Sequence, residues 1–280
     1  MQRISKHFRI GRRWLTFGWQ LFMRNPWSLG GMGFTTTVLV SVLSLIPLFG
    51  GLLVALLAPI LLASAYLTID GVYKQKIVLP ASLRLTALKE SPRQLIGVFH
   101  DETRIIPTAV ACIYSATGML LINLPAQFLT GGAWVANWSS LDRASLFGAV
   151  AATLLVFVLY VVLAASLIYA LPLAFLRDEP LIPSLLRSLK ASRHFVFALL
   201  VLLGVLLVPF CLDAIISKLS SWASKLAWLA LGSVIFPVVA AGLYCSYRDI
   251  FAVKEARVRT EARKADVPDR GLTLTGAARR

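Results

Sequence analysis

Few residues could do chemistry inside the long apolar segments of this chain. Asp213 is the only acidic residue within one of them, and an ionisable residue inside a membrane is a functional candidate by default. However, about 20 helical residues counted from Phe195 bring the chain to the outer interface near Asp213, where the carboxylate can reach water or Lys218. We therefore favour an interfacial position for Asp213 over a role in transport or in proton relay.

Asn123 and Gln127 are the other polar candidates within an apolar segment. They are four residues apart and therefore share one face of a helix, near Tyr114 and Thr117. Asn and Gln side chains in membrane proteins commonly form hydrogen bonds between helices. We favour that use over contact with a substrate.

No pattern in the sequence predicts a metal site, a cofactor site or a catalytic group. His100, Asp101 and Glu102 are consecutive, so on a helix they point in different directions. The glycines from Gly30 to Gly33 lack the Lys of a phosphate-binding loop and are interpreted as a flexible entry to the first apolar segment. No two cysteines form a Cys-x-x-Cys pair. We expect no enzymatic activity, no cofactor and no metal.

Six apolar segments predict six transmembrane helices, because about 20 helical residues cross a bilayer. A composition of 58% hydrophobic and 15% charged residues in 280 exceeds the apolar content of ordinary soluble domains. The predicted fold is all-α: residues 1–250 form a single polytopic domain, and residues 251–280 form a basic cytoplasmic tail that is partly disordered. The spans are expected at about 31–49, 51–69, 105–128, 146–176, 195–216 and 226–246.

The basic residues predict the orientation of these spans. Of the 28 Lys and Arg residues, 25 lie in alternate gaps between the apolar segments. Short loops rich in Lys and Arg stay in the cytoplasm, which predicts a multi-pass protein of the bacterial inner membrane with both termini cytoplasmic. Because the net charge of +15 follows this topology, we expect anionic membrane lipids as partners and no nucleic acid.

Two segments outside the spans are amphipathic and are expected to lie among the lipid headgroups. In the first, before the first span, one face carries Arg9, Arg12, Arg13 and Arg24 and the opposite face carries Ile10, Trp14, Phe17 and Leu21. In the second, before the fifth span, Ile182, Leu185, Leu186 and Leu189 lie opposite Ser184, Arg187 and Ser188. We expect the five arginines to contact anionic headgroups, and the seven tryptophans to form an aromatic belt at the interfaces.

A weaker amphipathic segment, Pro80 to Glu90, precedes the third span. Together with similar spacings, this suggests three copies of one unit, each an interfacial helix followed by a hairpin of two spans. Pro59 precedes Tyr66 by seven residues and Asp70 by eleven. Pro237 precedes Tyr244 by seven and Asp249 by twelve, and such periods indicate duplication. Prolines are tolerated in spans because neighbouring helices can satisfy the carbonyl that each proline leaves free.

Two stretches resemble a family of uncharacterised six-helix inner-membrane proteins of Gram-negative bacteria. They are Trp19 to Leu29 with the following LSLIPLFGGLLVALLAPILLASAY, and ALPLAFLRDEPLIPSLLRSLKAS. The second stretch is also similar to the membrane domain ahead of some glycerophosphodiester phosphodiesterases. The shared pattern is a late proline, an acidic residue and serines at helical spacing, here Pro172, Asp178, Ser184, Ser188 and Ser192. The resemblance implies a fold and an inner-membrane location but no activity, because this chain carries no phosphodiesterase domain.

These observations favour a non-enzymatic integral inner-membrane protein that acts as a scaffold, as an accessory subunit or in lipid homeostasis. The alternative is a carrier for a lipid or a small hydrophobic compound, suggested by the broken helices and by small residues such as Gly148, Ala151 and Ala152. An intramembrane enzyme using Asp213 ranks third. A polar cavity containing Asp213 and Asn123 would favour a carrier, and a dry, tightly packed bundle would favour the scaffold.

Overall fold

The chain is an all-helical, multi-pass membrane protein. The computed structural model describes residues 2–47, 49–74, 102–129, 143–216 and 221–252, which form eight α-helices, one short π-helix and no strand. Five helices are long and apolar enough to cross a membrane, and a sixth span results if α7 and α8, which meet at 94°, are counted together. The elements are α1 (Gln2–Arg24), α2 (Pro26–Ser44), α3 (Gly50–Lys74), α5 (Glu102–Leu129), α6 (Arg143–Arg177), α7 (Leu181–His194), α8 (Val196–Ile216), α9 (Ser221–Tyr247) and η4 (Arg248–Ala252). Residues 253–280 of the expected tail and the weaker amphipathic segment at 80–90 lie outside the described residues.

Local sequence explains where α2 begins and where α6 ends. Asn25 separates α1 from α2: its side chain accepts a hydrogen bond from the Ser28 amide at 3.4 Å, and Pro26 occupies the first helical position, which suits its fixed φ. At the end of α6, Asp178 adopts a φ of 55°, in the left-handed region that Asp tolerates better than most residues. The Glu179 amide then donates to the Leu173 carbonyl at 3.3 Å, which closes the last turn.

The glycines from Gly30 to Gly33 are helical, and their interpretation as a flexible entry was wrong. They belong to α2, which begins at Pro26 rather than near residue 31. A Cβ atom on Gly33 would lie 2.4 Å from the Ser233 carbonyl oxygen of α9. This glycine therefore lets the backbones of α2 and α9 approach closely, as small residues do between membrane helices.

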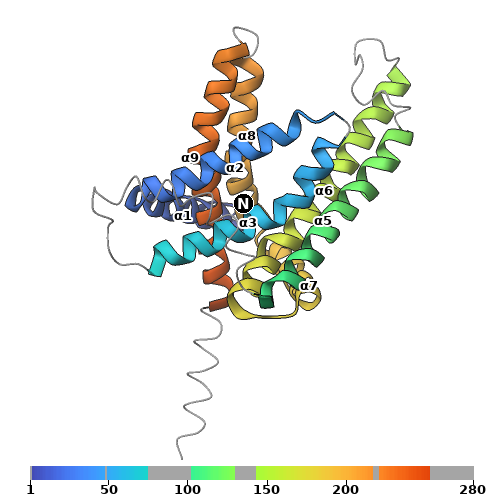
Figure 1. Ribbon diagram of the computed structural model, residues 1–280. Coiled ribbons are helices and arrows are strands. Elements are labelled where there is room, and N and C mark those ends of the chain that lie inside the picture. The colour runs from blue at the N-terminus through green and yellow to red at the C-terminus, as the bar shows by residue number, and fades with distance from the viewer. Residues whose placement is uncertain (1, 48, 75–101, 130–142, 217–220, 253–280) are drawn as a thin grey trace, which may run out of the picture.

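Helix α1 packs across α8 and α9 (Figure 1). A Cβ atom would lie 2.8 Å from the Ala198 carbonyl oxygen if added to Gly11, and 2.2 Å from the Val238 carbonyl oxygen if added to Gly18. Between these two contacts Trp14 is only 1% exposed. We expected the apolar face of this helix to meet lipid and Trp14 to join an aromatic belt; instead that face packs against protein.

The remaining helices form two leaning groups joined by α3 (Figure 1). Helices α8 and α9 lie side by side, as do α5 and α6, and α3 contacts α2, α5, α6 and α9. Consecutive long helices thus contact each other, α2 with α3, α5 with α6, and α8 with α9. The largest buried cluster runs from α1 through α3 and α6 to α9.

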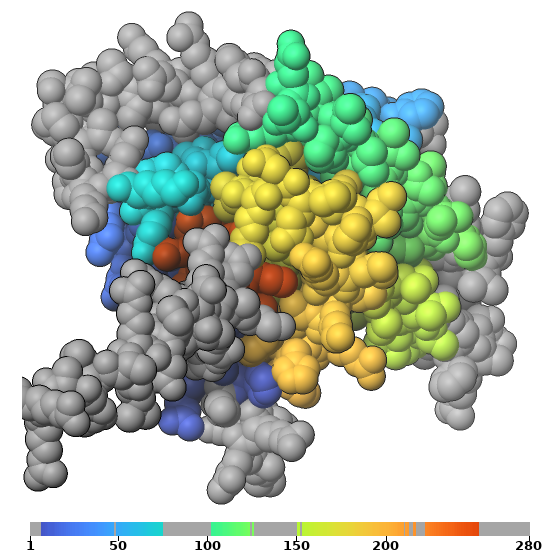
Figure 2. Space-filling view, turned by 90° about the horizontal axis from the view of Figure 1, so that it is seen from below, coloured from blue at the N-terminus to red at the C-terminus, as the bar shows by residue number. Residues whose placement is uncertain are grey.

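One end of the bundle collects basic side chains, and we call it the basic end. It is formed where α3, α6 and α9 end, at Lys74, Arg177 and Arg248. The view from below shows the end of α9 between α3 on one side and the α6–α7 region on the other (Figure 2).

Candidate functional site

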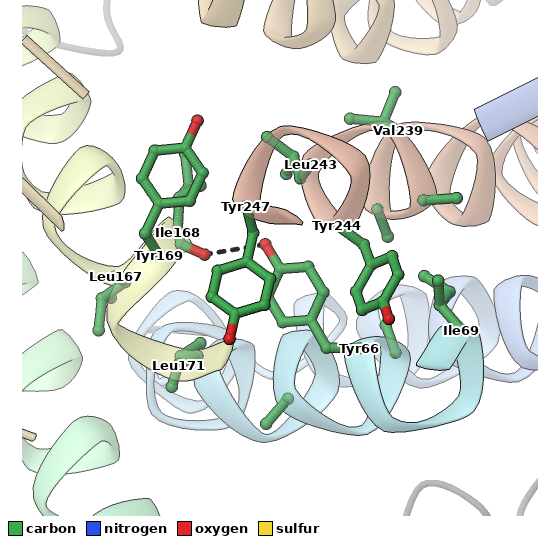
Figure 3. Packing of buried hydrophobic residues seen from close by; sticks show 14 of the residues in the cluster. Tyr66, Ile69, Leu167, Ile168, Tyr169, Leu171, Val239, Leu243, Tyr244 and Tyr247 are labelled. Carbon is green, nitrogen blue, oxygen red and sulfur yellow. Dashed lines mark hydrogen bonds between the residues drawn. The ribbon is translucent and has the colours of Figure 1, made fainter. Parts of the chain in front are cut away.

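The carbonyl that Pro172 leaves without a helical partner in α6 accepts a hydrogen bond from a side chain of α3. Pro172 has no amide hydrogen, so the Ile168 carbonyl four residues earlier loses its helical partner. The Tyr66 hydroxyl of α3 donates a hydrogen bond to this carbonyl oxygen at 3.0 Å (Figure 3). Because Tyr66 is fully buried, water cannot replace it as the partner.

Serines of α7 contact the backbone of α6 about one turn before the carbonyl that Tyr66 contacts. The Tyr169 amide donates to Ser188 Oγ at 3.0 Å, and Ser188 Oγ donates to the Ala165 carbonyl oxygen at 2.7 Å. In a regular helix this amide and this carbonyl would pair directly, so the hydroxyl is inserted into the helical ladder. Ser192 Oγ donates to the same carbonyl oxygen at 3.0 Å.

These contacts give a structural reason for the motif of proline, acidic residue and spaced serines. Ser184, Ser188 and Ser192 form the buried face of α7, while Ile182 and Leu186 on the other side are 69% and 70% exposed. Ser188 and Ser192 therefore join α7 to α6, whereas the Ser184 hydroxyl donates to the Pro180 carbonyl at the start of α7. None of them is left exposed as a nucleophile.

Two aspartates at the basic end link the ends of α3 and α9 to other helices. Asp70 of α3 accepts a hydrogen bond from the Tyr244 hydroxyl of α9 at 2.6 Å and forms a salt bridge with Lys74 at 2.6 Å. Asp249 forms a salt bridge with Arg13 and accepts a hydrogen bond from Trp14 Nε1 at 2.9 Å. Each aspartate of the repeated pattern thus accepts from an aromatic side chain of another helix. The spacing predicted a relation between them, but no sequence signal identified these partners.

A layer of tyrosines lies next to these aspartates, and we call Tyr66, Tyr169, Tyr244 and Tyr247 the tyrosine layer (Figure 3). All four side chains are buried. The Tyr169 and Ser246 hydroxyls lie 3.0 Å apart and share a hydrogen bond. The Arg177 guanidinium lies over the Tyr247 ring at 5.5 Å, a cation–π distance.

An apolar pocket of about 320 Å³ lies next to the tyrosine layer, between α3, α5, α6, α8 and α9. Leu62 and Leu243 line it, and Tyr66 and Tyr247 lie one turn further toward the basic end of the same helices. The volume is at the lower end of the roughly 300–1,000 Å³ of small-molecule sites. The lining also includes Ala58, Pro59, Met119, Ala164, Leu206 and Val239.

Among the described residues, two polar side chains and no charged one line the pocket. They are Ser115 of α5 and Tyr160 of α6, which alone of the described lining residues carry a side-chain oxygen or nitrogen. Sequence reasoning missed this site because its other lining residues are Ala, Leu, Ile, Val, Met, Phe and Pro, which look the same when they fill a packed core.

Of the three intramembrane candidates, Asn123 is the one whose side chain the structure describes, and it lies near the pocket. Asn123 Nδ2 donates to the Met119 carbonyl oxygen at 3.0 Å and to the Tyr160 hydroxyl, so it links α5 to α6 without lining the pocket itself. This is the interhelical use that we favoured. Gln127 belongs to α5 and Asp213 to α8, but their side chains lie outside the described part of the chain.

The five arginines expected at lipid headgroups differ in their surroundings. Arg9, Arg12 and Arg24 are exposed. Arg13 is also largely exposed but pairs with Asp249, and Arg187 pairs with Glu179 at 2.7 Å. Within the described residues, no group of three or more His, Cys, Asp or Glu side chains is placed to hold a metal ion.

Comparison of the chain with protein-family models, with curated proteins and with solved structures gave no match. A proposal for its function therefore rests on the pocket and its surroundings.

Proposed function

We propose that this chain is a non-enzymatic protein of the bacterial inner membrane that binds a hydrophobic molecule of the bilayer and acts in lipid homeostasis. The apolar pocket carries the proposal. Its walls come from five helices, it is large enough for a small ligand, and none of the described residues that line it is charged. A hydrophobic molecule gains by filling such a space, because apolar walls without partner atoms lose dispersion contacts.

The proposed topology is three hairpins with both termini in the cytoplasm. The contacts of α2 with α3, of α5 with α6 and of α8 with α9 support the hairpins. The basic end would then face the cytoplasm, where Arg9, Arg12 and Arg24 are exposed to anionic headgroups. We also propose that the chain is related to the six-helix inner-membrane proteins that its α6–α7 segment resembles.

The pocket favours binding over a purely structural role. A scaffold needs only well-packed helices, whereas this pocket is a partly open space between five helices that a bilayer molecule can enter. The pocket is also not the polar cavity that an ion or a sugar would need, because apolar side chains form almost all of its wall.

A carrier for the same molecule is the second candidate. Pro59 of α3 lines the pocket, and Pro172 of α6 follows the lining residue Leu171, so two helices with an internal proline border the bound molecule. Interrupted helices at a central site are typical of transporters. Reconstituted protein that binds the molecule but moves none of it between leaflets would exclude the carrier and leave the binding protein.

Ala164→Phe is expected to abolish ligand binding, because Ala164 lines the pocket and a phenyl group there fills it. Ala151→Phe is the matched control, since Ala151 is an exposed residue of the same helix. We expect wild type and Ala151→Phe, purified in mild detergent, to retain one class of hydrophobic compound that mass spectrometry of the extract detects at near-stoichiometric amounts. Ala164→Phe should retain less than about a tenth of that amount, which is a free-energy loss above roughly 1.4 kcal/mol.

Equal retention of the same compounds by all three proteins would refute the proposal. Thermal unfolding of each variant is recorded in parallel, so that a folding defect of Ala164→Phe is recognised. In that case Ala164→Leu, a smaller change at the same position, replaces it.

A further inference from the structure

We propose that the ligand of the pocket is a neutral hydrophobic compound with a carbonyl oxygen, and that this oxygen accepts a hydrogen bond from Ser115. The proposal rests on the proposed function and specifies its ligand. It is supported by the two hydroxyl groups in the pocket wall, which have unused hydrogen-bond donors among the described contacts.

Ser115 is a buried residue whose hydroxyl has no hydrogen-bond partner among the described residues. It is only 5% exposed, it lines the pocket, and it forms no hydrogen bond with any described residue. Other buried serines in these helices are satisfied locally: Ser64 donates to the Leu61 carbonyl and Ser246 to the Leu243 carbonyl. A buried polar group left unpaired is costly, so a ligand atom that completes this hydrogen bond would be bound preferentially.

Tyr160 provides a second donor in the same wall. Its hydroxyl oxygen accepts a hydrogen bond from Asn123 Nδ2, and within the described contacts its hydrogen is not used. Asn123 therefore positions a hydroxyl that can still donate. A carbonyl oxygen has two lone pairs and can accept from both hydroxyl groups.

The charge of the wall excludes an ionic ligand group. In the part of the chain that the structure describes, no Lys, Arg, His, Asp or Glu side chain lines the pocket, and a charge buried without a partner is strongly unfavourable. A phospholipid headgroup would therefore not enter the pocket.

The depth of Ser115 restricts the ligand further. Ser115 lies near the middle of α5 (Glu102–Leu129), which places its hydroxyl in the hydrocarbon region. The ester carbonyls of a phospholipid stay close to its headgroup at the interface. The ligand is therefore a compound that enters the hydrocarbon core entirely, and two sources offer this chemistry: an isoprenoid quinone and a neutral acyl ester such as diacylglycerol.

The test measures the binding of four radiolabelled probes to full-length protein in mixed micelles. The probes are ubiquinone, diacylglycerol, phosphatidylglycerol and squalene, a hydrocarbon without oxygen. We expect saturable binding of ubiquinone or diacylglycerol, and the stronger of the two identifies the source. Phosphatidylglycerol should not bind in the pocket, so Ala164→Phe should bind it to the same extent as wild type.

Ser115→Ala is expected to weaken binding of the carbonyl probe by roughly 2- to 10-fold, the range of one net hydrogen bond. It should leave the weaker binding of squalene unchanged. Ser64→Ala is the matched control, because its hydroxyl is buried but already bonded to backbone outside the pocket. Tyr160→Phe should also weaken binding of the carbonyl probe, and it provides a second variant if Ser115→Ala fails to fold.

Unchanged affinity of Ser115→Ala and Tyr160→Phe for both carbonyl probes would overturn this inference. If Ala164→Phe still abolished binding of the carbonyl probes, the proposed function would stand, but without the hydrogen bond to Ser115. Binding of phosphatidylglycerol that competes with the carbonyl probes would also overturn the inference. If Ala164→Phe bound every probe as wild type does, the proposed function itself would fail.

Discussion

Gly18→Leu is expected to lower the free energy of unfolding by about 3 kcal/mol, the upper end of the usual cost of overpacking. Even a Cβ atom at this position would lie 2.2 Å from the Val238 carbonyl oxygen, and a backbone atom cannot move aside as a side chain can. Helix α1 would therefore have to move away from α9, which would also expose Trp14. SDS-induced unfolding in mixed micelles, followed by tryptophan fluorescence, measures the loss.

Gly204→Leu is the matched control for this change. Gly204 is also helical, but a Cβ atom there meets nothing within 4 Å. Replacing a helical glycine removes its entropic cost, so we expect this variant to be roughly 0.5–1 kcal/mol more stable than wild type. Equal stability of the two variants would contradict the close packing of α1 against α9.

Tyr66→Phe is expected to lower the free energy of unfolding by about 1–3 kcal/mol, because the Ile168 carbonyl loses the donor that replaces the missing amide of Pro172. Pro172→Ala should restore an amide hydrogen at this position. In a Pro172→Ala background, Tyr66→Phe should therefore cost clearly less than in wild type. A double-mutant cycle from SDS unfolding of the four proteins gives the coupling between the two residues.

A coupling near zero would show that Tyr66 and Pro172 act independently, against the assignment of Tyr66 as the partner of the freed carbonyl. The phenyl ring of the variant keeps the packing of the buried side chain, so the change isolates the hydroxyl. Zero coupling means that Tyr66→Phe lowers the free energy of unfolding equally in wild type and in Pro172→Ala.

The sequence pattern located the helices, but it did not show whether lipid or protein contacts their apolar faces. The apolar segments correspond to helices because spans follow from length and hydropathy. The apolar stripe of α1 was visible too, yet whether Trp14 and Leu21 meet lipid or protein is not encoded in the stripe, because lipid tails are as apolar as a helix surface. The glycines Gly11 and Gly18 on the same helix were the available signal for close packing.

The polar contacts at the helix ends could be predicted only in part. The spacing of Asp70 and Asp249 after their prolines indicated related positions, and both accept hydrogen bonds from aromatic residues of other helices. Their partners, Tyr244 and Trp14, are 174 and 235 residues away in sequence, so no local pattern identifies them. The serines of α7 were recognised as a motif, but their insertion into α6 depends on the angle between the two helices.

The pocket could not be predicted from the sequence, because a cavity is a property of how helices diverge. Ala164 and Leu206 are ordinary apolar residues of spans, and nothing in their order shows that they face an open space. Ser115 was equally inconspicuous, since its lack of a local hydrogen bond appears only in three dimensions.

The central claim is that the pocket holds a molecule distinct from the surrounding bulk lipid. A benzophenone amino acid placed at Leu206, which lines the pocket, and separately at Leu207, which is 56% exposed on the same helix, tests it directly. After irradiation of native membranes, intact-mass spectrometry identifies the adducts. We predict one narrow mass class at position 206, reduced in the Ala164→Phe variant, and a broad set of phospholipid adducts at position 207. The same phospholipid adducts at both positions, unaffected by Ala164→Phe, would contradict the account.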